Sequence, residues 1–374
     1  MVSVHFCILI FRVWVIDIMN KSRKWMVALL STVLLILILL GSVIVVVDPY
    51  FHYHAPLSGL YYELNNERSQ NDGIIKHFDY DAMIIGTSMA ENFKTSELDE
   101  LFETNSIKVP FAGGTYKELN DNIAKAIEYN PDLRLVVRPL DYAYLLDDAD
   151  RVRDDLGTYP DYLYDKNPFN DVNYIFNKEI LYSICFPMLE AAMEGESEGI
   201  TSFDDYSNWM DGTEFGKSVV LGDRTKYKEP EQIQPFVEEV KEMVHDNITK
   251  NVVELAQANP DVQFYYYLTP YSIAWWGSQT ELGTEERFIS AEEYAIELML
   301  QCDNIHLFSF NTEFDLTCNL KNYSDECHHG DWINSQILSW LYSGTDLLTI
   351  DNYKEYIQVE REFYTSYDYA SLLK

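Results

Sequence analysis

The run from Trp25 to Val47 contains no charged side chain, and no other feature constrains this chain more strongly. An α-helix rises about 1.5 Å per residue, so about 20 apolar residues cross a hydrocarbon core of about 30 Å. A buried helix of a water-soluble protein normally keeps a polar stripe, and this run has none. The sequence therefore predicts one transmembrane helix at residues 25–47.

Charges on the two sides of this run predict its orientation. Lys21, Arg23 and Lys24 precede it and Asp48 follows it, and basic residues favour the cytoplasmic side of a membrane. Residues 1–24 are therefore expected in the cytoplasm, and the chain after Tyr50 is expected outside the cell membrane. No small-residue cleavage site follows the run, which predicts an uncleaved signal anchor.

Residues 1–18 form a shorter apolar stretch that Arg12 and Asp17 interrupt. This stretch is too short to span a membrane, and Met19, followed by Asn-Lys-Ser-Arg-Lys, has the character of a chain start. The sequence leaves two interpretations open for residues 1–18, a misassigned extension and an interfacial segment.

Acidic side chains dominate the composition. The chain has 61 Asp and Glu against 27 Lys and Arg, a formal net charge of −34, and its 47% hydrophobic residues are typical of a globular protein. The negative field repels polyanions, which excludes a nucleic-acid partner. The cysteines form no CxxC pair, so no zinc ribbon or thioredoxin-like motif is present. Cys302, Cys318 and Cys327 are compatible both with one disulfide and with free thiols.

Beyond a juxtamembrane segment at residues 48–77, apolar runs of strand length alternate with helical segments. The runs are apolar throughout rather than at every second position, which is typical of parallel strands buried on both faces. We therefore predict a three-layer α/β/α fold with a parallel sheet over residues 78–344. The expected strands are 82–85, 107–111, 133–137, 262–268 and 305–310, and the expected helices are 116–129, 231–258, 290–300 (with Ser290 and Glu293 as a capping box) and 332–341.

Two segments stand apart from this alternation. Between about 145 and 230 the chain is rich in Asp, Tyr and Asn and shows few clear elements. We interpret it as an insertion at the carboxyl edge of the sheet, where α/β proteins build their sites. Residues 345–374 are interpreted as a charged, tyrosine-rich helical tail.

Three short motifs carry residues suited to nucleophilic catalysis. Gly-Thr-Ser at 86–88 follows the first strand, where a tight turn exposes a hydroxyl near backbone amides. Phe-Ala-Gly-Gly-Thr at 111–115 follows the second strand, and glycine there lets a backbone N–H approach an oxyanion. Asp-Glu-Cys-His at 325–328 precedes the last helix and suits a base held by its own carboxylate. Taken singly, these motifs are as typical of a helix N-cap, a turn and a solvated loop.

In this order the motifs resemble the SGNH/GDSL hydrolase superfamily. The resemblance covers residues 80–341 and is carried by GTSMAENF, FAGGTYKEL and DECHH. It implies Ser88 as the nucleophile, His328 as general base and acid, and Asp325 as the residue that orients His328. It also implies the backbone amides of Ser88 and Gly113 in the oxyanion hole, and no cofactor.

One position departs from the family pattern. The family carries an asparagine after the third strand as a side-chain donor to the oxyanion, whereas this chain reads Arg138-Pro139-Leu140-Asp141 there. An ionised carboxylate repels a developing oxyanion, and loss of one such donor typically costs on the order of a hundredfold in rate. Asn92, one helical turn beyond the serine, Arg138 and Asp141 are the candidates for this third position.

Two other interpretations carry less weight. The loop 325–331 holds two aspartates, two histidines and a cysteine, but a metal site needs three or four convergent ligands at workable spacing. The nucleophile–base interpretation also explains where this loop lies in the fold, so no metal is expected. Trp275 and Trp276 follow the end of a strand near the expected cleft and are candidate stacking platforms for sugar rings.

A single anchor before an SGNH-like domain is also similar to DltD-like proteins of teichoic-acid alanylation and to AlgJ/AlgX-like O-acetyltransferases. The similarity implies a serine esterase or O-acyltransferase that acts on acyl esters of a cell-envelope glycan, with a membrane acyltransferase as a candidate partner. The alternative is a non-catalytic envelope protein whose SGNH fold binds a glycan or a membrane partner. Asp141 favours that alternative, whereas the retained Ser88, Asp325 and His328 favour the enzyme.

Overall fold

The computed structural model describes residues 2–153, 160–195 and 198–374, with side chains from residue 21 onward. The chain forms two compact units. The first, here the anchor unit, comprises Met1–Pro49, Pro56–Tyr61 and Asp161–Gly199, and the second, here the α/β unit, comprises Tyr50–Ala55, Tyr62–Pro160 and Ile200–Lys374.

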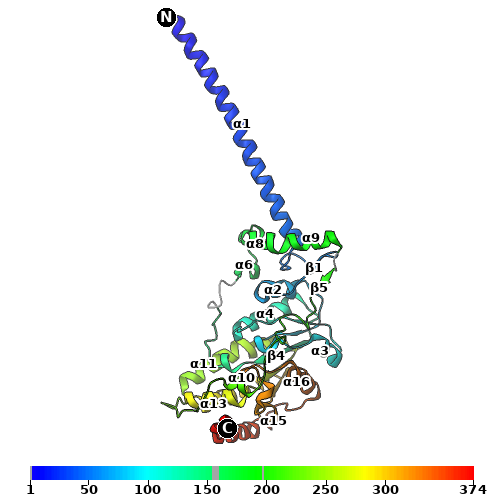
Figure 1. Ribbon diagram of the computed structural model, residues 1–374, viewed down its shortest axis with the longest axis vertical. Helices are drawn as coiled ribbons and strands as arrows, with labels where there is room; N and C mark the ends of the chain where they lie inside the picture. The colour runs from blue at the N-terminus through cyan, green and yellow to red at the C-terminus, as the bar shows by residue number, and fades with distance from the viewer. Residues whose placement is uncertain (1, 154–159, 196–197) are drawn as a thin grey trace. The chain divides into compact units, whose positions relative to one another are not determined.

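A five-stranded, fully parallel sheet forms the centre of the α/β unit (Figure 1). Its strands lie in the order β3-β2-β4-β6-β7. Its strands are β2 (Ala82–Ile84), β3 (Ser106–Lys108), β4 (Leu135–Leu140), β6 (Gln263–Leu268) and β7 (Ile305–Ser309). All residues of β2, β3 and β4 are buried. Burial on both faces explains the continuous apolar runs of the sequence, and the predicted α/β fold with a parallel sheet is confirmed.

Helices cover both faces of this sheet. Crossovers that advance from β3 toward β7 pass through α4 (Tyr116–Tyr129), α11 (Glu238–Ile248) and α14 (Glu285–Met299). Because crossovers between parallel strands are right-handed, these three helices share one face. The crossover from β2 to β3 runs in the opposite direction through α3 (Thr95–Phe102), which packs against α16 (Asp331–Ser343) on the other face.

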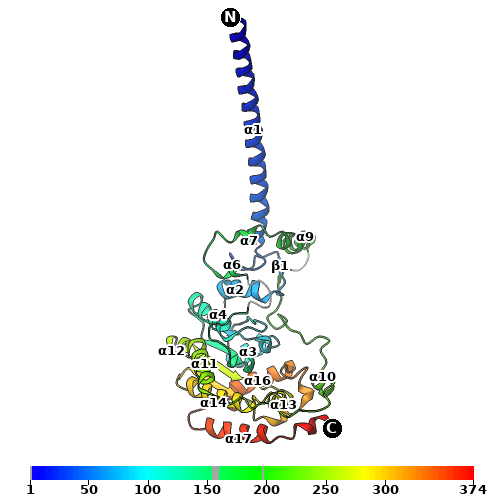
Figure 2. The same cartoon turned by 90° about the vertical axis from the view of Figure 1, so that its left-hand side faces the viewer.

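Shorter elements complete the α/β unit, and α17 packs on α13 and α14 (Figure 2). The helices are α2 (Glu67–His77), α5 (Tyr142–Leu145), α10 (Lys217–Leu221), α12 (Glu254–Ala258), α13 (Ile273–Leu282), α15 (Phe314–Thr317) and α17 (Tyr353–Ser366). The 3-10 turns are η1 (Ser88–Ala90), η4 (Leu320–Asn322) and η5 (Tyr369–Leu373), and η3 (Thr249–Val253) is a π turn. Two short strands, β1 (Tyr61–Tyr62) and β5 (Gly199–Ile200), pair with each other.

The anchor unit is built on one long helix, α1 (Val2–Val47). Its part from Lys21 to Val47, 27 residues, is long and apolar enough to cross a membrane. The backbone is already helical from Val2, so the stretch before Met19 continues the same helix. The anchor unit also includes part of the segment 145–230, in which few elements were expected. Its short helices are joined by Asn, Asp and Pro residues: α6 (Asp161–Tyr164), α7 (Val172–Ile175), α8 (Lys178–Ile180), the π turn η2 (Leu181–Cys185) and α9 (Phe186–Glu194).

Two predicted helix starts are wrong. α11 begins at Glu238 rather than at residue 231, because Pro235 lacks an N–H and disfavours helical backbone at the residue before it. α14 begins at Glu285, so Ser290 is not a cap but an interior residue, and its hydroxyl donates to a glutamate one turn earlier at 3.3 Å.

Two side-chain expectations are settled as well. Cys302, Cys318 and Cys327 are free thiols, so the disulfide interpretation is wrong. The tryptophans are not platforms for a sugar, because Trp275 is 7% exposed and Trp276 is fully buried. The start of α13 turns both indoles into the aromatic core.

Candidate active site

Ser88 lies at the carboxyl end of β2, in a turn that depends on the two residues before it. Gly86 packs so closely on β4 that a Cβ there would lie 2.5 Å from Pro139 Cγ. Thr87 then caps the 3-10 turn, since its Oγ1 accepts a hydrogen bond from Met89 N at 3.2 Å. Ser88 is the first residue of the turn and is partly exposed. A hydroxyl in this position is accessible, as a nucleophile requires.

His328 lies in the loop between η4 and α16, and Asp325 shapes that loop. Asp325 Oδ1 accepts from the backbone N–H of both Cys327 and His328, each at 2.7 Å. The loop is closed by Ser324 N, which donates to His328 O at 2.9 Å. The carboxylate therefore fixes the backbone of the residue that its other oxygen contacts.

Ser88, His328 and Asp325 form one hydrogen-bonded chain. The Ser88 hydroxyl lies 2.7 Å from His328 Nε2, and His328 Nδ1 lies 2.6 Å from Asp325 Oδ2. A carboxylate accepts at Nδ1, so Nδ1 carries the proton and Nε2 is free to accept one from the serine. The structure thus brings Ser88 together with His328, 240 positions later in the chain, and with Asp325, three positions before His328. This is the arrangement of nucleophile, base and orienting acid.

The charges around His328 suit these roles. Burial alone lowers the pKa of His328, but the hydrogen bond and charge of Asp325, together with the charge of Asp141, raise it more, so the pKa lies above its ordinary value. Burial raises the pKa of Asp325, but its bonds with His328 and with the backbone lower it more, so it lies below its ordinary value. The neighbouring His329 is buried, which lowers its pKa to about 4 and keeps it neutral.

Two backbone amides at the site are available as oxyanion donors. Across the described residues, neither Ser88 N nor Gly113 N donates to a protein acceptor. Gly113 has φ +64°, a left-handed conformation that favours glycine. These are the two amides that the sequence resemblance assigns to the oxyanion hole.

The peptide group that carries the Gly113 N–H is held from its other side. Arg68 Nη2 donates to Ala112 O at 2.9 Å, and Glu67 Oε2 accepts from Ala112 N at 2.7 Å. In a trans peptide the C=O and the following N–H point in opposite directions. The Arg68 guanidinium therefore directs the Gly113 N–H away from itself, and its positive charge polarises that N–H as a donor.

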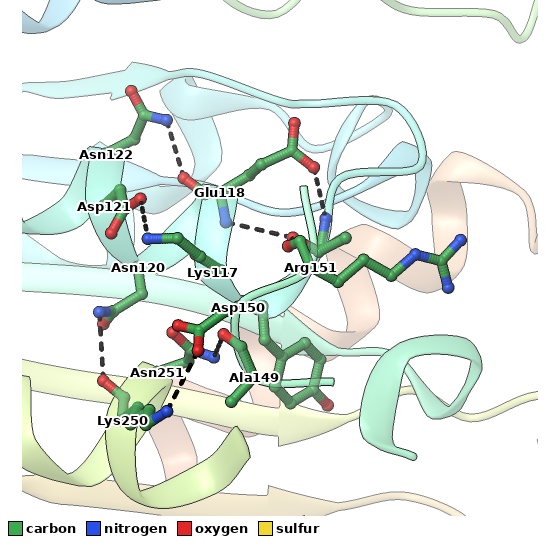
Figure 3. Close-up of polar contacts among 12 residues, drawn as sticks. Lys117, Glu118, Asn120, Asp121, Asn122, Ala149, Asp150, Arg151, Lys250 and Asn251 are labelled. Atoms are coloured by element: carbon green, nitrogen blue, oxygen red, sulfur yellow. Dashed lines mark hydrogen bonds and ion pairs between the residues drawn. The ribbon is translucent and has the colours of Figure 1, made fainter. Parts of the chain in front are cut away.

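A second arginine holds the next carbonyl. Arg153 Nη1 donates to Gly113 O at 2.8 Å. Side chains of neighbouring elements fix the residues just before Arg153. Asn251 Nδ2 donates to the carbonyl of residue 149 at 2.9 Å (Figure 3), and Thr115 Oγ1 donates to the carbonyl of residue 151 at 2.6 Å. Both carbonyls that flank the Gly113 amide are thus bound by guanidinium groups.

Asp141 lies beneath the serine turn and is 2% exposed. Its Oδ2 accepts from the Thr87 hydroxyl at 2.7 Å and its Oδ1 from the Tyr271 hydroxyl at 2.8 Å. Burial raises the pKa of Asp141 above its ordinary value, although these two hydrogen bonds lower it in part. Both oxygens accept from hydroxyl groups, so Asp141 is engaged with the turn and is not a donor to an oxyanion.

The two other candidates for the third donor differ. Arg138 is fully buried and donates to the carbonyls of Asn251 and Tyr116, at 3.1 and 3.3 Å, so the structure directs it into the core. Asn92 Oδ1 accepts from Trp209 N at 3.1 Å, which assigns the orientation of its amide. Asn92 is 2% exposed and lines, with Ser88, a small hollow that has no room for a water molecule, so it is the one of the three whose side-chain N–H lies near Ser88.

Several contributors to the site were not predicted, among them Arg68, Glu67, Arg153 and Trp209. Arg68 and Glu67 begin α2 and belong to no recognisable motif, and their contacts to Ala112 join positions 44 and 45 residues apart. Trp209 packs edge-on to the His328 ring, with 5.7 Å between ring centroids. It lies in the segment interpreted as an insertion, where only the general expectation of a site at the carboxyl edge of the sheet pointed to it.

No family model matches the chain, and no curated protein matches it. Among solved structures, one match is described as "a putative platelet activating factor from Streptococcus pneumonia". The match has a TM-score of 0.35 at 12% sequence identity and covers 74% of this chain and 90% of that chain. A similarity of this size carries no argument about activity, which is argued below from the geometry of the site.

Proposed function

We propose that this protein is an SGNH-type serine esterase or O-acyltransferase that uses Ser88 as its nucleophile. The observation that carries the proposal is the chain Ser88–His328–Asp325, with contacts of 2.7 and 2.6 Å. The two unengaged amides of Ser88 and Gly113 support it, because acyl transfer needs donors at the developing oxyanion.

The proposed reaction runs through an acyl-enzyme. Ser88 Oγ attacks the carbonyl carbon of an acyl ester, while its proton passes to His328 Nε2 and the carbonyl electrons move to the oxygen held by the two amides. Collapse breaks the ester C–O bond, and His328 returns the proton to the leaving hydroxyl. Water or an acceptor hydroxyl then attacks the acyl-enzyme in the same way and releases Ser88.

The substrate and location follow from the sequence resemblance and the anchor. We propose that the α/β unit lies outside the cytoplasm, because Lys21, Arg23 and Lys24 precede the apolar helix. We further propose acyl esters of a cell-envelope glycan as the substrate, with a membrane acyltransferase as a donor partner. The net charge of −34 favours a neutral or cationic polymer over a polyanionic one.

The second candidate function is a non-catalytic envelope protein that binds a glycan or a membrane partner. The aspartate at position 141 suggested it, because this residue replaces a donor of the family. Both Asp141 oxygens accept from hydroxyl groups of the fold, so the substitution has a structural use and does not in itself favour loss of activity.

Mass spectrometry of the full chain after treatment with a serine-directed fluorophosphonate tests the proposal. We expect a covalent adduct on Ser88 that is absent in Ser88→Ala and strongly slowed in His328→Ala. Ser339→Ala and His245→Ala are matched controls, because both residues are exposed and lie away from the site. A folded chain that forms no adduct would favour the binding function instead.

A further inference from the structure

Among its described side chains, from Lys21 onward, the long helix α1 is covered by protein near its C-terminal end. Large side chains from Trp25 to Leu39 are mostly exposed, whereas Gly41, Ile44 and Val47 are buried. Gly41 is the contact point, since a Cβ added there would lie 2.7 Å from Ile175 Cγ2. Glycine thus lets α7 approach α1 closely.

A buried hydrogen bond fixes this contact. The Tyr174 hydroxyl donates to Asp48 Oδ1 at 2.8 Å, and both side chains are fully buried. Asp48 directly follows the last residue of α1, so α7 is tied to the end of the helix as well as to its side. Figure 1 shows α8 and α9 beside this same end of α1.

The contact at Gly41 defines how deep this packing lies. The uncharged run of α1, Trp25–Val47, has 23 residues, which at about 1.5 Å per residue makes about 35 Å, about 5 Å more than a hydrocarbon core. Gly41 lies about six residues, or about 9 Å, before the end of the helix. With the core centred on this run, Gly41, and with it the contact to Ile175 and Phe176, lies about 7 Å inside the hydrocarbon, within the depth range of about 5–10 Å for interfacial helices.

The segment around α7–α9 also exposes large apolar side chains. Within residues 161–195, the exposed large apolar side chains are Phe169, Val172, Phe176, Tyr182, Phe186 and Met193. Exposed apolar clusters of this kind mark interaction sites. Trp25 is 68% exposed at the opposite end of the span, and aromatic residues at both ends are typical of membrane proteins.

An apolar groove joins this segment to the span. It is lined by Leu37, Ile38, Gly41 and Val45 of α1, by Ile175 at the end of α7, and by Phe176, which follows α7. Leu37 and Ile38 belong to the part of α1 that is predicted to lie in the bilayer. The groove is therefore continuous with the lipid-facing surface of the helix, which favours lipid acyl chains as its occupant.

We propose that residues 161–195, here the collar, form an interfacial segment that lies in the leaflet at the C-terminal end of the span, with acyl chains in the groove beside Phe176. This rests on the proposed membrane insertion of α1. The collar fixes how far α1 projects from the bilayer, because it is attached to the helix at Gly41 and at Asp48.

Spin-label quenching in lipid nanodiscs tests the collar. The full chain carries an NBD fluorophore at a cysteine introduced by Phe176→Cys, or by Val172→Cys if the first variant does not fold. The fluorescence of the labelled, unsubstituted chain is subtracted to remove the signal of the native cysteines. The nanodiscs contain phosphatidylcholine with or without doxyl-labelled lipid. Leu34→Cys reports on the span, and Ile350→Cys, 64% exposed in the α/β unit, is the control in water.

We expect doxyl lipid to quench the probe at position 176 at least about twofold more than the probe at position 350, as lipid-embedded side chains require. Quenching at position 34 without quenching at 176 would overturn the collar and leave the anchor intact. Quenching at neither position would overturn both. A blue-shifted probe at 176 that lipid does not quench would also overturn the proposal, in favour of a second copy or another protein on this face.

Discussion

Arg68 gives the sharpest test of the proposed oxyanion hole. Arg68→Met keeps the apolar stem and removes the donor that binds Ala112 O at 2.9 Å. A hydrogen bond from a charged group contributes about 1.5–3 kcal/mol, and about 1.4 kcal/mol corresponds to tenfold in rate. If the contact acts fully in the transition state, the rate falls about 10- to 100-fold, less than the loss of on the order of 100- to 1000-fold for removing a whole donor.

The assay is the second-order rate of fluorophosphonate labelling at Ser88, with kcat and KM on a p-nitrophenyl ester and a thermal melt as companions. Orientation of an oxyanion donor changes kcat and leaves KM nearly unchanged, because the oxyanion forms only in the transition state. Arg134→Met is the matched control, since Arg134 also binds a backbone carbonyl, that of Glu103, at 2.6 Å, but is 51% exposed. Labelling of the Arg68 variant at the wild-type rate, or an equal loss in the control, would refute the reasoning.

Three further predictions follow from the same geometry. Because its bond and charge interaction with Asp325 raise the pKa of His328 above its ordinary value, the labelling rate should increase with pH with a midpoint above about 6.5. Asp325→Asn should lower that midpoint. An unchanged midpoint in a pH titration of the labelling rate would contradict this prediction. Gly113→Ala should slow labelling and destabilise the fold by about 1–2 kcal/mol, because a Cβ at φ +64° would lie 2.7 Å from Arg153 Nη1. Labelling rates test the first effect and denaturant melts test the second. Burial and the charge of Glu292 raise the pKa of Glu360 well above its ordinary value, so the folded state keeps a proton that the unfolded chain loses, and stability falls as pH rises. Glu360→Gln should therefore raise the melting temperature at about pH 8 and not at about pH 4. A variant with a lower melting temperature at both pH values would contradict this prediction.

The sequence predicted those parts of the molecule that local pattern determines. Continuous apolar runs predicted buried parallel strands, and the order of the strands in the chain then places their carboxyl ends at one edge. Ser88 lies at that edge because its motif directly follows β2, and Asp325 reaches His328 because the two are three residues apart in one loop. In each case a short-range feature was sufficient.

The remaining features depend on contacts between distant segments, for which the sequence carries no local signal. Arg68 reaches Ala112 across 44 positions, and nothing in the first turn of α2 distinguishes it from any other basic residue. The start of α11 was misplaced because periodicity continues through Pro235, whereas the backbone does not become helical until Glu238. The indoles of Trp275 and Trp276 were assigned to a cleft from their place after a strand, but burial depends on which way the helix turns.

Asp141 shows that the effect of an unexpected residue depends on its hydrogen-bond partners as well as on its charge. Considered alone, a carboxylate at a donor position opposes an oxyanion. In the fold it accepts from Thr87, and Thr87 in turn accepts from Met89 N within the turn that bears Ser88. A neutral asparagine has one acceptor oxygen and would not hold Thr87 and Tyr271 in the same way. The aspartate therefore supports the turn that bears Ser88, while the amides of Ser88 and Gly113 remain the proposed oxyanion donors, with the buried Asn92 as the nearby side-chain candidate.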